Sequence, residues 1–71
     1  MPIVHIDLME GRGSERIEGM IRAVSEAVAT SLDAPIESVR VVVREMAAHQ
    51  YGVGGRPWPE VVAERQASQG G

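Results

Sequence analysis

Two alternating apolar segments flank one long amphipathic segment, and this pattern constrains the fold more than any other feature of the chain. In residues 3–8 every second side chain belongs to one apolar face, and residues 39–46 show the same period of two. This period is typical of β-strands that are covered on one side. Between them, residues 14–32 repeat apolar side chains with helical spacing. A strand, a helix and a strand in this order predict a βαβ unit with two parallel strands and a right-handed crossover.

The predicted helix has one apolar stripe and a signal at each end. Glycines within residues 10–13 predict a tight turn before it, because glycine adopts backbone conformations that other residues avoid. Ser14 is the expected N-cap. The residue before Pro35 is sterically kept out of the helical region, so the helix should end there. The stripe comprises Ile17, Met20, Ile21, Val24, Ala27, Val28 and Leu32.

The rest of the chain is rich in glycine and proline. Residues 51–54 predict a small hairpin or edge segment, and the prolines of residues 57–59 predict an extended segment. A turn or two of helix is expected over residues 60–67, with a disordered end at 68–71. The predicted fold class is therefore α+β, one βαβ unit with a C-terminal hairpin, in a single domain of 71 residues whose variable tail covers about 56–71.

One face of the predicted sheet has nothing to cover it. A single helix covers one side, which leaves Ile3, His5, Arg40 and Val42 facing water on the other. A chain this short buries only about 60% of the surface that its unfolded form exposes. We therefore expect a homo-oligomer in which the sheets of different subunits pack together.

Composition removes most of the usual catalytic groups. The chain has no cysteine and no lysine, so all seven of its basic residues are arginines, and disulfides, thiolate metal sites and lysine Schiff bases are excluded. His5 and His49 do not form a metal-ligand spacing, so we expect no metal. A net charge of −3 without a basic stripe argues against nucleic acid, and no apolar run is long enough for a membrane. Without a signal-peptide pattern, the cytoplasm is the expected location.

The amine of Pro2 is the remaining candidate for a base. If Met1 is removed, Pro2 carries a free secondary amine, and an ordinary α-amino group has a pKa near 8. Burial among apolar side chains and nearby arginines both lower such a pKa, because each disfavours the ammonium form. The amine would then be in the range that a general base needs near neutral pH. Arginine is also well suited to hold carboxylates, because its planar fork donates two parallel hydrogen bonds.

Several short segments give a more specific signal. They are Pro2-Ile3, Leu8-Met9-Glu10-Gly11-Arg12, Ile21-Arg22-Ala23-Val24-Ser25-Glu26-Ala27, Ser31-Leu32-Asp33-Ala34-Pro35, Ser38-Val39-Arg40-Val41, Glu45-Met46-Ala47 and Gly52-Val53-Gly54-Gly55. In this combination the chain resembles the 4-oxalocrotonate tautomerase family, without a gap through about residue 55. The resemblance implies a βαβ subunit in a homohexamer, a trimer of dimers, that is a cofactor-independent isomerase. Such enzymes serve aromatic hydrocarbon catabolism or the biosynthesis of a specialised metabolite.

The resemblance also implies a role for four residues. Pro2 would be the general base that takes a proton from the hydroxyl of a dienol acid, of the 2-hydroxymuconate type, and returns one to a distant carbon. Arg12 would hold the far carboxylate and draw electron density toward it. Arg40 of a neighbouring subunit would bind the near carboxylate and the enol oxygen. Tyr51 stands where the family usually has the phenylalanine of an apolar wall.

Other interpretations remain open. The same scaffold could hydrate and dehalogenate a haloacrylate, although the extra carboxylate that relatives use for this is missing beside Gly52-Val53-Gly54. The chain could also be a non-catalytic oligomeric binder of dicarboxylates if Met1 is retained, because an acylated Pro2 has no basic lone pair. Arg12 could be an ordinary solvated turn residue, and Arg40 could pair with a carboxylate across an interface. For Trp58 we expect a contact that fastens the tail to a neighbouring subunit in preference to a contact with the substrate.

Overall fold

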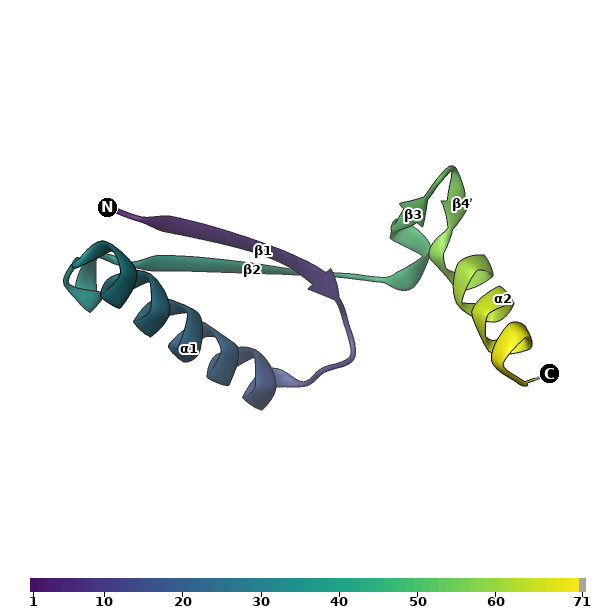
Figure 1. The fold of residues 1–71 in the computed structure, drawn as a ribbon, viewed down its shortest axis with the longest axis horizontal. Helices are drawn as coiled ribbons and strands as arrows, with labels where there is room; N and C mark the ends of the chain where they lie inside the picture. Colours follow the sequence, from purple (N-terminus) through teal and green to yellow (C-terminus); the bar gives the residue numbers. More distant parts are fainter. Residues whose placement is uncertain (71) are drawn as a thin grey trace.

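The computed structural model describes residues 1–70 and contains two separate parts, a βαβ unit and a C-terminal hairpin with a helix (Figure 1). These parts lie at opposite ends of an elongated molecule and are joined by the end of the second strand. The α+β class, the parallel strand pair, the long helix and the hairpin are all confirmed. The elements are β1 (Ile3–Met9), α1 (Ser14–Leu32), the 3-10 turn η1 (Ile36–Ser38), β2 (Arg40–Met46), the 3-10 turn η2 (Ala48–Gln50), β3 (Gly52–Val53), β4 (Arg56–Pro57) and α2 (Trp58–Gly70).

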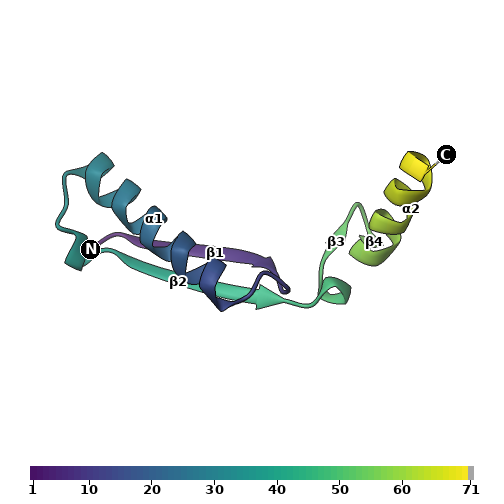
Figure 2. The same ribbon diagram turned by 90° about the horizontal axis from the view of Figure 1, so that it is seen from below.

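The two long strands run parallel, with Ile3 opposite Arg40 and Met9 opposite Met46. Figures 1 and 2 show that α1 lies along one face of this pair and leaves the other face open. Half-buried and exposed side chains alternate over residues 3–8 and 40–44, as the period-2 pattern predicted. The half-buried set on the helix side is apolar and comprises Val4, Ile6, Leu8, Val41 and Val43.

The start of α1 differs from the prediction. The N-cap is Gly13, with φ 85° and ψ 152°, and it forms no side-chain cap. Its carbonyl accepts a 3.3 Å hydrogen bond from the Ile17 N–H. Ser14 is therefore the first helical residue and not the cap, because the positive φ that glycine tolerates already turns the chain into the helix. The helix ends at Leu32, as predicted.

The C-terminal part confirms the hairpin and corrects the segment after it. Gly54 and Gly55 form the turn of the hairpin with φ angles of 61° and 80°, the left-handed conformation that two-residue hairpin turns require. The expectation of an extended segment is wrong from Trp58 onward, because α2 begins there. Pro59 fits in its first turn, since N–H groups in that turn have no partner within the helix. The backbone of α2 continues to Gly70, and Gly71 lies outside the described residues.

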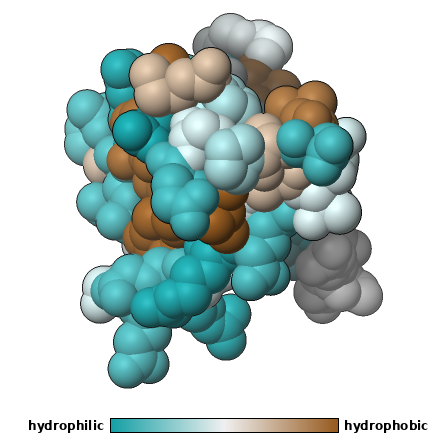
Figure 3. Space-filling model, turned by 90° about the vertical axis from the view of Figure 1, so that its left-hand side faces the viewer, coloured by the Kyte–Doolittle hydropathy of each residue, from teal (hydrophilic) through white to brown (hydrophobic). Residues whose placement is uncertain are grey.

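The subunit has no interior of its own. None of the side chains in residues 1–67 is fully buried, and the radius of gyration is 16.4 Å. A compact domain of this length has a radius of gyration of about 11 Å. Apolar surface lies open between polar side chains at the end of the molecule that holds the N-terminus (Figure 3), and on the uncovered sheet face Ile3 is 55% exposed. This exposure supports the expected assembly, because monomeric proteins rarely leave such a face in water.

A charge on the uncovered face should disrupt the assembly. Val42 lies in the middle of β2 and is 39% exposed. We expect wild type to elute in size exclusion as a species several times heavier than 7.6 kDa, and Val42→Asp to shift toward the single chain, because an unpaired buried carboxylate costs several kcal/mol. Ala23→Asp, on the exposed side of α1, is the matched control and should elute like wild type. A stable monomeric wild type would contradict this prediction.

Candidate active site

Arg12 is held at the edge of the βαβ unit by the glycines on either side of it. Gly11 and Gly13 have φ angles of 117° and 85°, so the chain makes a sharp bend between β1 and α1. The Arg12 Nη1 donates a 2.9 Å hydrogen bond to the carbonyl oxygen of Met9. This bond fixes the guanidinium with one donor and leaves its other donors for a ligand.

Arg12 also has no carboxylate partner among the described residues. The ion pairs in this part of the chain join Arg22 to Glu18 and Arg56 to Glu64. An arginine that is anchored by a backbone carbonyl and lacks a counter-ion is ready to hold the carboxylate of a ligand, because both of its parallel donors can reach one carboxylate group.

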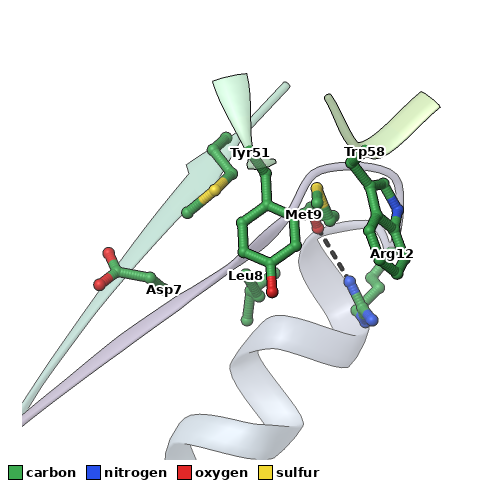
Figure 4. Close-up of a pocket in the computed structure, with 7 residues that line it drawn as sticks. Asp7, Leu8, Met9, Arg12, Tyr51 and Trp58 are labelled. Carbon is green, nitrogen blue, oxygen red and sulfur yellow. Dashed lines mark hydrogen bonds between the residues drawn. The ribbon is translucent and has the colours of Figure 1, made fainter. Parts of the chain in front are cut away.

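The Arg12 guanidinium borders a hollow of about 330 Å³ whose walls are mostly apolar. Figure 4 shows the rings of Tyr51 and Trp58 reaching from the C-terminal part toward the end of β1 and the Arg12 turn. The lining residues are Asp7, Leu8, Met9, Arg12, Met46, Tyr51 and Trp58. Besides the carboxylate of Asp7, the hollow offers one tethered cation among apolar and aromatic surfaces, which suits a flat acid with a conjugated chain.

The two aromatic walls of the hollow are fastened to each other. The backbone N–H of Trp58 donates a 2.7 Å hydrogen bond to the Tyr51 carbonyl oxygen. Their ring centroids lie 5.4 Å apart with an interplanar angle of 70°, the edge-to-face arrangement that aromatic pairs favour. Tyr51 is 40% exposed, so its ring is accessible at the hollow.

Pro2 and Arg40 lie together at the opposite end of the sheet. The Arg40 backbone N–H donates a 2.9 Å hydrogen bond to the Pro2 carbonyl oxygen, and Ile3 pairs with Arg40 across the strands. The Arg40 Nη1 donates a 2.7 Å hydrogen bond to the Glu37 carbonyl oxygen, so this guanidinium is anchored to a carbonyl three residues back, as that of Arg12 is. Both candidate carboxylate-binding side chains are therefore exposed and tethered to the backbone.

One chain does not bring all four candidate residues together. Arg12 and Tyr51 share the hollow, whereas Pro2 and Arg40 lie at the far end of β1. At about 3.3 Å per residue, the seven residues of β1 separate Pro2 from Arg12 by about 20 Å. A six-carbon acid cannot bridge that length. A site that uses both Pro2 and Arg12 must therefore take them from different subunits.

The structure adds residues to which the sequence analysis gave no role at this site. Leu8, Met9 and Met46 supply apolar surface, and Trp58 contacts its own chain at the hollow. One signal was visible beforehand, since Leu8 and Met9 break the apolar alternation at the end of the first strand. The contact of Trp58 had no such signal, because the hairpin between Tyr51 and Trp58 decides where the indole lies.

Residues 1–70 contain neither a cluster of metal-binding side chains nor a helix that could cross a membrane. No three side chains of histidine, aspartate or glutamate gather there in a group that could hold a metal ion. Neither of the two long helices in this part of the chain has the length and apolar character needed to cross a bilayer.

Similar sequences and structures are found among known proteins. The family model described as tautomerase enzyme matches residues 2–58. A 2-hydroxymuconate tautomerase of Pseudomonas putida is 53% identical over 57 residues, which are 80% of this chain and 90% of that protein. The solved structure of a heterohexamer 4-oxalocrotonate tautomerase from Chloroflexus aurantiacus J-10-fl is 33% identical, with a TM-score of 0.81 over 86% of this chain and 98% of its own.

A further solved structure extends the similarity over most of the tail. It is one of the 4-oxalocrotonate tautomerase isozymes from Methylibium petroleiphilum, 33% identical with a TM-score of 0.77, and it covers 94% of this chain and 98% of its own. The family model covers well over half of the chain, and the Pseudomonas relative is far above 30% identity. The chain therefore belongs to the tautomerase family, enzymes of the isomerase class.

Proposed function

We propose that the chain converts a 2-hydroxydienoate of the 2-hydroxymuconate type into its conjugated 2-oxo-enoate, with the amine of Pro2 as the proton carrier. The observation that carries this proposal is the hollow in which an anchored Arg12 without a counter-ion faces apolar and aromatic walls. The 53% identity to a 2-hydroxymuconate tautomerase supports the choice of substrate.

In the proposed reaction the neutral amine of Pro2 takes the proton of the 2-hydroxyl group. The oxygen electrons form the new C2–O double bond, and the two carbon–carbon double bonds collapse into one between C3 and C4. The ammonium form of Pro2 then gives its proton to C5, next to the far carboxylate. Electrons and protons balance within the substrate and the amine, so the reaction needs no co-reactant. Base and acid are the same group, and its pKa must therefore lie near the working pH.

The arginines are proposed to bind the two ends of the substrate. Arg12 holds the far carboxylate and stabilises the charge that develops on the conjugated chain. Arg40 of a neighbouring subunit holds the near carboxylate and the enol oxygen. A preorganised cation in a water-poor site stabilises developing negative charge strongly. The apolar walls of the hollow exclude water and keep the amine in its neutral form.

The proposed assembly is a hexamer, a trimer of dimers, in which each site takes residues from more than one subunit. The open sheet face, the lack of buried side chains in residues 1–67 and the separation of Pro2 from Arg12 support this arrangement. A closed oligomer repeats the same contacts around a symmetry axis, so every subunit can contribute to an equivalent site.

The decisive experiment compares two forms of the protein on 2-hydroxymuconate. Intact-mass measurement first establishes that Met1 is absent from the active preparation. That form should convert the substrate far faster than buffer does, followed by the change in ultraviolet absorbance. A matched form with extra residues before Met1 should be inactive, because an acylated Pro2 nitrogen cannot accept a proton. Equal rates in the two forms, or no turnover by the form that begins at Pro2, would reject the proposal.

A further inference from the structure

Trp58 occupies a defined place that the proposed proton transfer does not require. It begins α2, is half-buried, and is tied through its backbone N–H to the carbonyl oxygen of Tyr51 at 2.7 Å. The guanidinium carbon of Arg65 lies 5.2 Å from the centroid of the Trp58 ring. The backbone bond fixes the start of α2, and the ring of Tyr51 and the guanidinium of Arg65 contact the indole itself, so these three contacts favour one position of the ring at the hollow.

The geometry of α2 explains how Arg65 reaches the ring. Residues 58 and 65 are seven positions apart, which places them on the same side of a helix. Helical side chains slant toward the N-terminus, so the long arginine side chain extends back over the first turn. Its interaction with the ring is of the cation–π type. Arg65 therefore supports one side of the indole, while the indole also lines the Arg12 hollow.

The position of the ring relative to Arg12 points to the part of the substrate that it contacts. In Figure 4 the indole lies beside the Arg12 side chain, at the same end of the hollow. Because Arg12 and Trp58 line the same hollow, a carboxylate bound by Arg12 would place the carbon atoms next to it near the indole. A flat unsaturated chain can pack on an aromatic ring without losing planarity.

We propose that Trp58 is a specificity-determining residue that selects substrates with a long, flat chain ending in a carboxylate, and that Arg65 is its positioning residue. This inference rests on the proposed function, since it assigns the far end of the substrate to the Arg12 hollow. The selectivity arises from the tail of the chain, which supplies both the indole and its support.

Kinetics with two substrates of different length test this proposal. The first is 2-hydroxymuconate, and the second is 2-hydroxypenta-2,4-dienoate, which lacks the far carboxylate and does not fill the Arg12 end. We expect Trp58→Ala to raise KM for the long diacid about tenfold with little change in kcat, the size of effect that one aromatic contact supplies. For the short substrate kcat/KM should stay within about twofold of wild type, because its chain makes little contact with the indole.

Arg65 variants separate positioning from a general structural role. Arg65→Gln should raise KM for the diacid about threefold, whereas Arg65→Lys keeps a cation over the ring and should recover most of the loss. Gln66→Ala, one position along the same helix, is the matched control and should behave like wild type. Equal losses on the long and short substrates, or no loss on either, would overturn the proposal.

Fluorescence gives a second test that does not depend on turnover. Trp58 is the single tryptophan of the chain, so selective excitation of indole reports on this site alone. Adipate, a six-carbon diacid that cannot tautomerise, should change the emission saturably in wild type and in Pro2→Ala, and much less in Arg12→Ala. Sodium chloride at equal ionic strength should have no such effect.

The kinetic test and the fluorescence test distinguish a failure of the proposed function from a failure of the role proposed for Trp58. If wild type turned over neither substrate, the proposed function would fail, and the adipate titration would still decide the role of Trp58. If Trp58→Ala did not assemble, Trp58→Phe would keep an aromatic ring in the wall and should show a smaller rise in KM for the diacid alone. No adipate response in wild type would overturn the assignment of Trp58 to the substrate site.

Discussion

Replacing Pro2 by alanine is expected to lower kcat on 2-hydroxymuconate by about 100-fold or more, the loss typical of a displaced general base. Alanine still leaves an amine after removal of Met1, but that amine is primary and sits on a freely rotating backbone. The pyrrolidine ring instead fixes the direction of the nitrogen lone pair. Stopped-flow measurement of kcat, with intact mass confirming the new N-terminus, checks the result.

The pH dependence of the same pair of proteins identifies the titrating group. The neutral amine is the active form, so kcat/KM should be low at acidic pH, rise through the pKa of the amine and level off above it. An amine in an apolar site should titrate below the ordinary value of about 8. Pro2→Ala should move or abolish this limb, whereas His49→Gln, which replaces an exposed histidine that does not line the hollow, should keep it. A variant at Pro2 with the turnover and pH profile of wild type would remove Pro2 from the mechanism.

Replacing Arg12 by alanine is expected to lower kcat/KM for the diacid by about 100-fold or more, because it removes a charge-assisted pair and a preorganised cation together. Arg16→Ala is the matched control, since Arg16 is exposed nearby on α1 and does not line the hollow. It should retain nearly full activity. Loss of equal size in both variants would point to a general effect of charge and not to a substrate contact.

Mixing two inactive variants tests whether the site is shared between chains. Pro2 and Arg12 are about 20 Å apart within one subunit, so the proposed site, which uses both, must take them from different subunits. Unfolding Pro2→Ala and Arg12→Ala together and refolding them should give mixed oligomers in which about a quarter of the sites have both wild-type residues. Activity should therefore return to about a quarter of the wild-type value. No gain over the separate proteins would contradict a shared site.

Much of the fold was predictable from the sequence because it depends on local periodicity. The alternation of residues 3–8 and 39–46 and the stripe of residues 14–32 decide strand, helix and strand without reference to any distant contact. The Gly54-Gly55 turn follows equally from the backbone freedom of glycine. Two local predictions were wrong. The N-cap of α1 is Gly13 and not Ser14, and a helix begins at Trp58 where an extended segment was expected.

The residues of the candidate site could be predicted from the sequence, but their arrangement could not. The sequence was enough to select Pro2, Arg12, Arg40 and Tyr51 as candidates. The chain has no cysteine or lysine, and its short segments resemble those of a known family. Which of these residues share a surface depends on the register of β1 and β2 and on the fold of the hairpin, because these set positions for residues far apart in the chain. The structure unites Arg12 with Tyr51 and separates both from Pro2 and Arg40.

Spacing and composition were enough to predict the βαβ unit, the uncovered sheet face and the chemical groups that the chain can use. The three-dimensional fold was needed to show that Arg12 and Pro2 lie at opposite ends of β1 and that the indole of Trp58 lines the Arg12 hollow. The physical reason is that an extended strand separates Pro2 from Arg12, which are only ten positions apart in the sequence. The hairpin brings Trp58 close to Arg12, although 46 positions separate these two residues.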